Sequence, residues 1–236
     1  MPCEYPLFID LTNRLTVVVG AGNVAARKVD KLLSAGARVR VVAREIAERV
    51  ESLVAGGTGS LSASVSAANT GRQAARATQL ELVRENFRPD HVKGAFLVFA
   101  CTDNPEVNAE VAKAARAAGA LVNRADAPDD CDFFVPAVSE HGPVKLAIST
   151  GGASPALAKF IRRQLDEHLP PGLGELAGEL AEARSMVQKR VARPEDRAAI
   201  WETLCGEESI RRLTDEGMDA WRQWFEQVVS TAGQGS

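Results

Sequence analysis

A glycine-rich turn between a predicted strand and a predicted helix is the first feature of this sequence that could do chemistry. Gly20, Gly22 and Ala25 follow the β-branched run at 15–19, and an amphipathic stretch begins at Ala25. In such a turn the first glycine permits tight curvature, the second lets a pyrophosphate approach the backbone, and the small third residue lets helix and strand pack closely. The N–H groups at the helix start favour an anion. The pattern predicts a dinucleotide-binding turn; a structural turn that binds nothing is the alternative.

The end of the next predicted strand bears on which dinucleotide is bound. An acidic side chain about 20 positions after the turn would hold the ribose 2′-hydroxyl of NAD. Here Arg44 stands near that place and Glu45 follows it. An arginine at this position accepts the 2′-phosphate of NADP, whereas Glu45 is able to turn to the ribose. Spacing alone leaves NAD and NADP open.

Thr102 follows another predicted buried strand, at 95–100, and would lie at the same edge of the sheet. We therefore expect it to contact the dinucleotide. The alternative is a purely structural role beside Asn104 and Pro105, which form an N-cap and a first helical residue.

A carboxylate that follows the last predicted strand of the sheet is the candidate catalytic group. Asp126 comes after the strand at 120–122 and therefore lies at the carboxyl edge, where open α/β sheets bind their ligands. A carboxylate there can remove a proton as hydride leaves the substrate. An aspartate before Ala-Pro is also a common turn former. The neighbouring Asp129, Asp130 and Asp132 compete for the same role.

A loop of small residues before a later helix is the candidate substrate site. Its exposed backbone N–H groups, with the dipole of the following helix, favour an anion. Lys159, Arg162 and Arg163 follow within two turns, so the loop is suited to the carboxylates of an acidic substrate. An ordinary capped helix with a solvated basic face is the alternative. The residues predicted to bind substrate are Ser149, Thr150, Gly151, Gly152, Ser154 and Lys159.

Parallel strands are needed to bring the first four of these features to one edge. Strands expected at 15–19, 39–43, 80–84, 95–100 and 120–122 alternate with helical stretches, which is typical of a Rossmann-type α/β sheet. Residues 132–135 and 144–148 flank a turn signal and predict an antiparallel hairpin outside that sheet. A helix opens at Ser154, and the chain from Pro170 onward is helical and charged. Residues 55–79 are small and polar, which predicts a mobile surface insertion.

Composition narrows the class of protein further. The 236 residues carry a net charge of −3, which provides no basic field for nucleic acid or an anionic membrane surface. No apolar run of about 18 residues and no secretory signal is visible, so we expect a cytoplasmic protein. Four scattered cysteines without a CxxC pair, and only three histidines, argue against a disulfide framework or a metal site.

Six motifs occur in the order found in a known family. Together they resemble the precorrin-2 dehydrogenase / sirohydrochlorin ferrochelatase family, which is also the N-terminal module of multifunctional siroheme synthases. The resemblance covers roughly residues 4–165, and the helical remainder fits less distinctly. The motifs lie at Pro6–Leu11, Val17–Lys28, Ala100–Asn104, Asn123–Pro128, Phe133–Pro136 and Ile148–Ala158.

The resemblance implies NAD-dependent oxidation of precorrin-2, a tetrapyrrole, to sirohydrochlorin. Some members of the family also insert ferrous iron to give siroheme, which is the alternative activity. It further implies a homodimer with an NAD-binding Rossmann domain at 1–124, a dimerisation and substrate region at 125–165 and a helical C-terminal domain at 166–236. A rival hypothesis from another class is an NAD-binding, redox-sensing regulatory module without turnover.

The resemblance also implies roles for individual residues. The family's essential aspartate falls on Asp126, and its NAD contacts fall on Gly22, Asn23 and Val24 and on the end of the second strand at Arg44 and Glu45. Because the family often lacks the ribose-binding acid, Arg44 need not indicate NADP. One departure is Thr150, which stands where some relatives carry a second serine.

Overall fold

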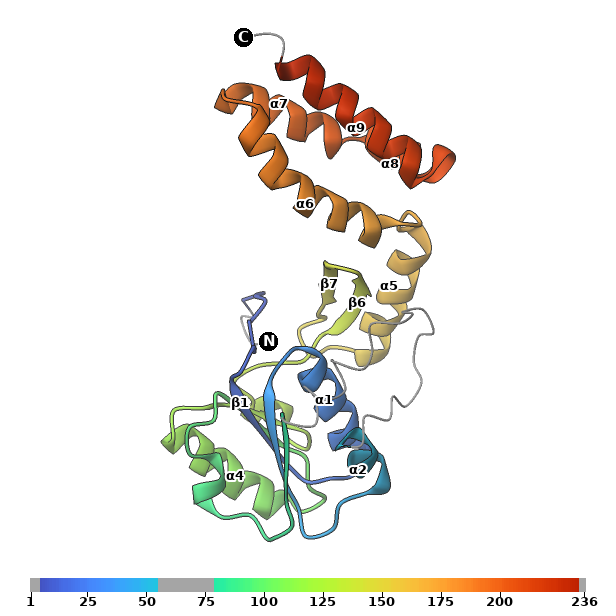
Figure 1. Cartoon of the computed structure of the whole chain (residues 1–236). Helices are drawn as coiled ribbons and strands as arrows, with labels where there is room; N and C mark the ends of the chain where they lie inside the picture. The colour runs from blue at the N-terminus through green and yellow to red at the C-terminus, as the bar shows by residue number, and fades with distance from the viewer. Residues whose placement is uncertain (1–4, 55–78, 234–236) are drawn as a thin grey trace. The chain divides into compact units, whose positions relative to one another are not determined.

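The computed structural model describes residues 5–54 and 79–233, and their contacts divide them into two compact units. The first unit ends at Val135 and the second begins at Pro136 (Figure 1). The insertion expected at 55–79 lies, apart from Gln79, outside the described residues. Residues 125–135 belong to the first unit by their contacts, and the assignment of 125–165 to dimerisation stays a prediction.

The first unit is built on a five-stranded parallel sheet with the strand order β3-β2-β1-β4-β5. From β1 the chain adds β2 and then β3 on one side of the sheet, and it then crosses to add β4 and β5 on the other side. The winding direction therefore changes between β1 and β4. This confirms the expected Rossmann-type sheet. The strands are β1 (Leu15–Val19), β2 (Arg38–Val42), β3 (Leu80–Val83), β4 (Leu97–Ala100) and β5 (Leu121–Arg124).

Helices cover both faces of this sheet, and the alternation of side chains along each strand supplies both cores. Val18, between two residues of the opposite face, packs with α1 (Asn23–Ser34) and the short α2 (Glu48–Val54), a helix that the sequence analysis missed. Val17 and Val19 pack with α4 (Pro105–Ala117) and with a 3-10 turn at Pro89–Val92. Figure 1 shows α1 and α2 on one side of the sheet and α4 on the other. Burial on both faces explains why the central strands β1 and β4 are almost entirely apolar.

The second unit begins with an antiparallel hairpin, β6 (Ala137–His141) and β7 (Val144–Ile148). The hairpin itself was expected, but its first strand was placed wrongly at 132–135. His141 pairs with Val144, so the turn is only Gly142-Pro143. With this register the strand that pairs with β7 starts at Ala137, which pairs with Ile148. Phe133 packs instead against Phe99 of β4, with ring centroids 5.3 Å apart, and so belongs to the first unit.

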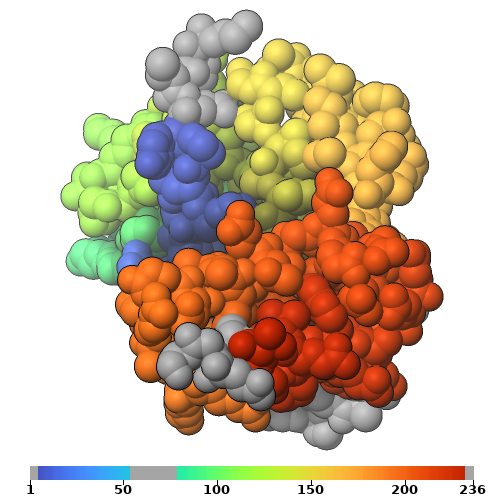
Figure 2. Space-filling model, turned by 90° about the horizontal axis from the view of Figure 1, so that it is seen from above, coloured from blue at the N-terminus to red at the C-terminus, as the bar shows by residue number. Residues whose placement is uncertain are grey.

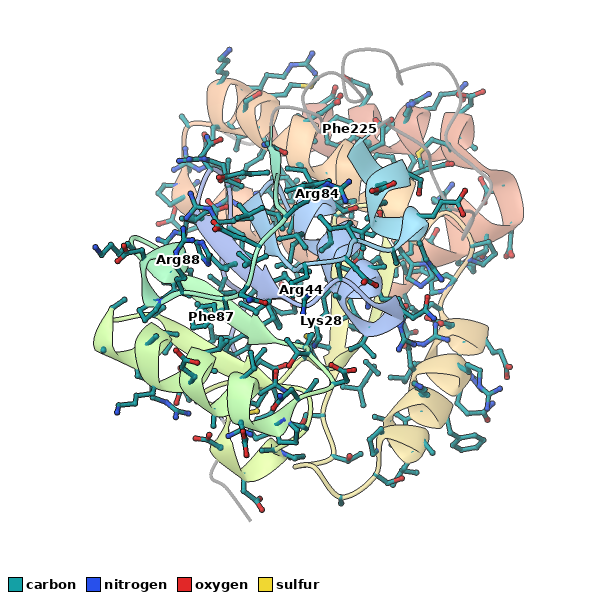
Figure 3. The ribbon with its side chains drawn as sticks, turned by 90° about the horizontal axis from the view of Figure 1, so that it is seen from below. Lys28, Arg44, Arg84, Phe87, Arg88 and Phe225 are labelled. Carbon is teal, nitrogen blue, oxygen red and sulfur yellow. The ribbon has the colours of Figure 1, made fainter. Side chains whose placement is uncertain are left out.

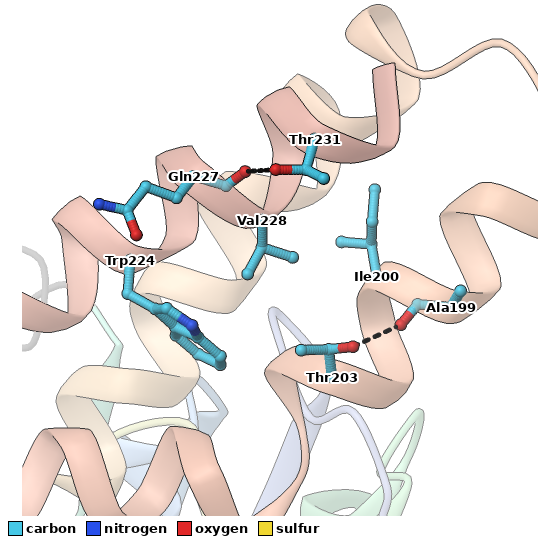
Figure 4. A pocket seen from close by; sticks show the side chains of 7 residues that line it. All are labelled: Ala199, Ile200, Thr203, Trp224, Gln227, Val228 and Thr231. Atoms are coloured by element: carbon cyan, nitrogen blue, oxygen red, sulfur yellow. Dashed lines mark hydrogen bonds between the residues drawn. The ribbon is translucent and has the colours of Figure 1, made fainter. Parts of the chain in front are cut away.

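Helices make up the rest of the second unit. Helix α5 (Pro155–His168) packs on the hairpin, and the next four are α6 (Leu173–Arg190), α7 (Pro194–Leu204), α8 (Glu207–Glu216) and α9 (Met218–Gly233). Helices α6–α9 share one core around the fully buried Trp221, and they form the orange and red surface of Figure 2. A shallow groove between α7 and α9, about 460 Å³, is lined by Ile200, Trp224 and Val228 among others (Figure 4). Among the described residues, no helix is both long and apolar enough to span a membrane.

Candidate functional site

The glycine turn lies at the point where the winding of the sheet reverses, which is where such sheets bind ligands. Gly20 has a φ of +103°, a conformation that side-chain-bearing residues rarely adopt. A Cβ atom added there would lie 2.5 Å from the carbonyl oxygen of Cys101, at the end of β4. The loops after β1 and β4 therefore touch through the space that only glycine leaves open.

The start of α1 has the properties of an anion site. Its N-cap is Gly22, which provides no capping side chain, and its first turn carries no acidic residue. A Cβ atom at Gly22 would meet nothing within 4 Å, so this face of the turn is open. The first N–H groups of any helix have no intrahelical partner, and here they include those of Asn23 and Val24. The cradle fits the pyrophosphate of a dinucleotide.

The loop after β2 runs beside this turn. The backbone N–H of Ala47 donates to the carbonyl oxygen of Ala21 at 3.4 Å. Arg44 and Glu45 lie between β2 and this contact, and both are exposed. Figure 3 labels Arg44 together with Lys28 of α1. Arg44 and Glu45 are thus both accessible at the edge of the site, and their contact with a dinucleotide stays a prediction.

Thr102 has its hydroxyl already engaged. The hydroxyl lies 2.7 Å from Oδ1 of Asn108, 3.0 Å from the carbonyl oxygen of Asn104 and 3.2 Å from its N–H. Asn108 is fully buried and also pairs with the backbone N–H and carbonyl of Thr102. The loop after β4 is therefore held rigidly by an asparagine that sequence reasoning missed. A dinucleotide contact through Thr102 would use its exposed surface rather than free its hydroxyl.

Asp126 follows β5 at the same edge and is paired with an arginine. Nη2 of Arg124 lies 2.8 Å from Oδ2 of Asp126, and Nε lies 3.3 Å from Oδ1. The chain bends at residues 125–126, directly after β5, and the two side chains meet across this bend. The hydrogen bonds from Arg124 are the main cause of the lowered pKa of Asp126, with a smaller contribution from Asn108. At neutral pH this carboxyl group is ionised, which is the form that a proton acceptor requires.

The competing aspartates have other roles in the structure. Arg116, in the last turn of α4, pairs with Asp130 at 2.7 Å and with Asp132 at 3.1 Å. Asp132 also accepts the backbone N–H of Val122 at 2.9 Å, so it closes the loop back onto β5. These two carboxylates stabilise the loop. Asp129 is exposed on a 3-10 turn at Pro128–Asp130.

Lys28 is a second charged residue that the sequence analysis did not assign to the site. Its Nζ donates to Oδ1 of Asn123 at 3.2 Å and lies 4.7 Å from the centre of the Phe99 ring. Burial lowers the pKa of Lys28, while burial raises the pKa of the nearby Cys101 to about 11. The cysteine is thus a neutral thiol, as expected for a packing residue. A lysine spaced one helical turn and a half from a glycine turn is the only sequence signal that could have identified Lys28.

The predicted substrate loop belongs to the second unit and precedes α5. Ser154 caps the helix by accepting the N–H of Leu157 at 3.2 Å, and Thr150 Oγ1 accepts the N–H of Ser154 at 3.1 Å. Gly151 and Gly152 have φ values of +60° and +79°, and neither has an atom within 4 Å of an added Cβ. The loop is therefore ordered by its own hydrogen bonds and open to solvent at its glycines.

The basic residues of α5 divide into two kinds. Arg162 pairs with Asp166 at 2.5 Å, and that carboxylate also accepts from Ser139 of β6. Lys159 and Arg163 are exposed. Ser149 is exposed and accepts the N–H of Gly151 at 3.2 Å.

Within the described ranges, no group of three or more histidine, cysteine or acidic side chains is arranged to hold a metal ion.

Comparisons with known proteins agree with this arrangement. A family model described as putative NAD(P)-binding matches residues 7–137, more than half of the chain. A second, described as the central part of a sirohaem biosynthesis protein, matches residues 141–168. A solved structure of SirC, a precorrin-2 dehydrogenase, aligns with a TM-score of 0.73 and 24% identity over 95% of this chain and 100% of that one, which establishes the fold.

Curated relatives with a similar sequence are siroheme synthases. The siroheme synthase of Actinobacillus pleuropneumoniae serotype 3 (strain JL03) is 34% identical over 210 residues, which are 89% of this chain and 39% of the relative. That of Pseudomonas aeruginosa (strain LESB58) is 36% identical over 208 residues, or 88% and 40%. This chain spans about two fifths of the length of these relatives. It belongs to the putative NAD(P)-binding family found in siroheme synthases, which is the family that its motifs resemble.

Proposed function

We propose that this chain is an NAD-dependent dehydrogenase that oxidises precorrin-2 to sirohydrochlorin. One observation carries the proposal: an ionised carboxylate, Asp126, lies at the edge where the sheet reverses its winding, near the glycine turn. Asp126 and Cys101 are close enough to interact electrostatically, and the carbonyl of Cys101 borders Gly20. The names of the relatives, siroheme synthase and precorrin-2 dehydrogenase, support precorrin-2 as the substrate.

The residues of the chain divide the reaction into binding and proton transfer. Bound NAD supplies the acceptor for the hydride that leaves the tetrapyrrole. The backbone at Gly20, Gly22, Asn23 and Val24 holds the pyrophosphate, and Asp126 accepts the proton that the tetrapyrrole loses with the hydride.

The loop before α5 is proposed to hold the carboxylates of the tetrapyrrole. Its open glycines leave backbone N–H groups accessible, and Lys159 lies on the first turns of the helix that Ser154 caps. The segment 149–163 contains three basic residues and no acidic one. This local excess of positive charge suits a polyanion, although the whole chain carries a net charge of −3.

We propose a homodimer because α5 exposes large apolar side chains. Leu157, Phe160 and Leu165 expose 48%, 50% and 40% of their surfaces, and they recur at helical spacing along one helix. An apolar stripe of this kind is typical of a protein–protein contact. Light scattering after gel filtration measures the oligomeric state; a monomer at micromolar concentration would contradict the dimer.

The decisive test is turnover of precorrin-2 by the purified protein with NAD. We expect the absorption spectrum of sirohydrochlorin to appear together with NADH. Replacing Asp126 by asparagine should slow this reaction by about 10²- to 10⁴-fold, the usual contribution of a general base. The matched control is Asp129→Asn, which changes an exposed aspartate three residues away and should leave the rate unaltered. Absence of the product spectrum with wild-type protein contradicts the proposed reaction.

The same assay separates the alternatives. Parallel reactions with NAD and NADP show whether Arg44 selects a 2′-phosphate. Anaerobic reactions with ferrous iron, with and without the protein, measure whether siroheme forms. A redox-sensing module would bind NAD tightly, show no affinity for the tetrapyrrole and give no turnover.

A further inference from the structure

The side chain of Arg124 is nearly buried and makes several hydrogen bonds, which the sequence alone does not predict. Its side chain is only 11% exposed, although it is the last residue of the short strand β5. Besides its two hydrogen bonds to Asp126, it donates from Nη1 to Oδ2 of Asp130 at 2.8 Å and from Nη2 to the carbonyl oxygen of Pro105 at 3.4 Å. The guanidinium is thus held by the residue after β5, by the loop beyond it and by the start of α4.

These contacts hold the side chain of Arg124 in one position, and Arg124 in turn holds Asp126. Asp130 is itself held by Arg116 at 2.7 Å, and Arg116 is anchored to Asp132 and so to the backbone of Val122. Each link is a charged hydrogen bond, and an arginine fork that grips a carboxylate at two points defines the plane of that carboxylate. Through this series of ion pairs, the side chain of Asp126 is held in place relative to α4 and β5.

We infer that Arg124 is a positioning residue, which orients the Asp126 carboxylate for proton transfer and stabilises its negative charge. The inference rests on the proposed dehydrogenase reaction and adds a role for a residue beside the reacting group. The fork occupies one lone pair on each carboxylate oxygen. A carboxylate has about four such sites, so acceptor positions remain for a proton.

An NMR titration tests the electrostatic half of this inference without any substrate. Protein labelled with carbon-13 at the aspartate carboxyl groups gives one signal that is lost in Asp126→Asn, which assigns it. In Arg124→Gln we expect the pKa of Asp126 to rise by about 1 to 2 units, because an adjacent opposite charge lowers a carboxyl pKa by that order. Arg124→Lys keeps the charge but loses the fork, and should show a smaller rise.

The matched control is Arg40→Gln on β2. Arg40 is also partly buried, and it bonds the carboxylate of Glu81 at 2.8 Å and the carbonyl oxygen of His91 at 2.9 Å, whereas Arg124 bonds two carboxylates and one carbonyl oxygen. The variant therefore removes a comparable arginine from the same unit and should leave the titration of Asp126 unchanged. An identical Asp126 titration in wild type and both Arg124 variants overturns the inference. If Arg124→Gln does not fold, Arg124→Lys provides the decision.

Kinetics test the orienting half. In Arg124→Gln we expect kcat to fall at least tenfold with little change in the KM for precorrin-2, and the acidic limb of kcat/KM to move to higher pH. A rise in that KM with an unmoved pH profile would mean that Arg124 binds a substrate carboxylate, and would refute the positioning role. Lack of turnover in wild type contradicts the proposed function alone, because the NMR titration still decides the electrostatic effect of Arg124.

Discussion

Replacing Gly20 and Gly22 by alanine, one at a time, should separate folding from dinucleotide binding. At Gly20 the added Cβ would lie 2.5 Å from the Cys101 carbonyl oxygen, whereas real Cβ atoms essentially never approach within 3.0 Å. The φ of +103° adds strain of about 1–3 kcal/mol. Displacing the backbone of the β4–α4 loop costs about 1–3 kcal/mol more, by analogy with overpacked cores. We therefore expect Gly20→Ala to lower the free energy of unfolding by about 3 kcal/mol, near the upper end for single substitutions.

At Gly22 the same methyl group meets no protein atom, and the backbone angles, φ −79° and ψ −171°, suit alanine. The free energy of unfolding should change by less than about 1 kcal/mol, the typical difference among N-cap residues. The methyl group would nevertheless stand where a pyrophosphate approaches the backbone. We expect the Kd for NAD to rise at least about tenfold, a loss of about 1.4 kcal/mol in binding.

Thermal unfolding followed by circular dichroism and NAD titration by calorimetry measure the two effects. For a unit of this size, about 3 kcal/mol corresponds to a fall in Tm of roughly 10 °C for Gly20→Ala. A Gly22→Ala protein that binds NAD as tightly as wild type would refute the assignment of the turn. A Gly20→Ala protein as stable as wild type would refute the close contact between the loops after β1 and β4.

Three further substitutions test individual contacts. Ser209→Ala should destabilise the helical unit by about 1–3 kcal/mol in urea unfolding, because the indole N–H of the buried Trp221, now 2.6 Å from Ser209, would lose its partner. Ser154→Ala removes the N-cap of α5 and should cost about 1 kcal/mol in the same measurement, whereas Ser154→Asp should retain it. Asp130 has a pKa lowered by its hydrogen bonds to Arg124 and Arg116. Its stabilising effect, measured against Asp130→Asn, should therefore be present above about pH 5 and diminish as the pH falls below about 4; a constant difference across this range would contradict the pairing.

The sheet was predictable because its strands are buried on both faces. Runs such as 15–19 are continuous and β-branched, so they could be identified without knowledge of their neighbours. The glycine turn and Asn104 then mark the helix starts after β1 and β4. Their edge position follows from topology, since every parallel strand ends at the same side.

The hairpin and the short helix α2 were not predictable in the same way. The apolar residues Phe133 and Phe134 resemble a strand, but Phe133 is drawn to Phe99, a partner 34 positions earlier in the sequence. The true strand β6 contains Ser139, Glu140 and His141, whose polar character gives little strand signal. Ser139 is buried because it meets Asp166 of α5. Long-range contacts of this kind override local pattern.

Four aspartates between residues 126 and 132 differ in their surroundings rather than in their chemistry. Asp130 is paired through both oxygens, and Asp132 is tied to Arg116 and to the backbone of β5. Asp129 is exposed, with no arginine contact among the described residues. Asp126 pairs with Arg124 through both of its oxygens. Its side chain is 24% exposed, against 40% for Asp130 and 29% for Asp132, so exposure does not single it out. Its distinguishing feature is its arginine two residues away, whose other partners come from α4 and the loop beyond β5. The order of residues places Arg124 beside Asp126, but only the fold shows that Asp130 and Pro105 hold it there.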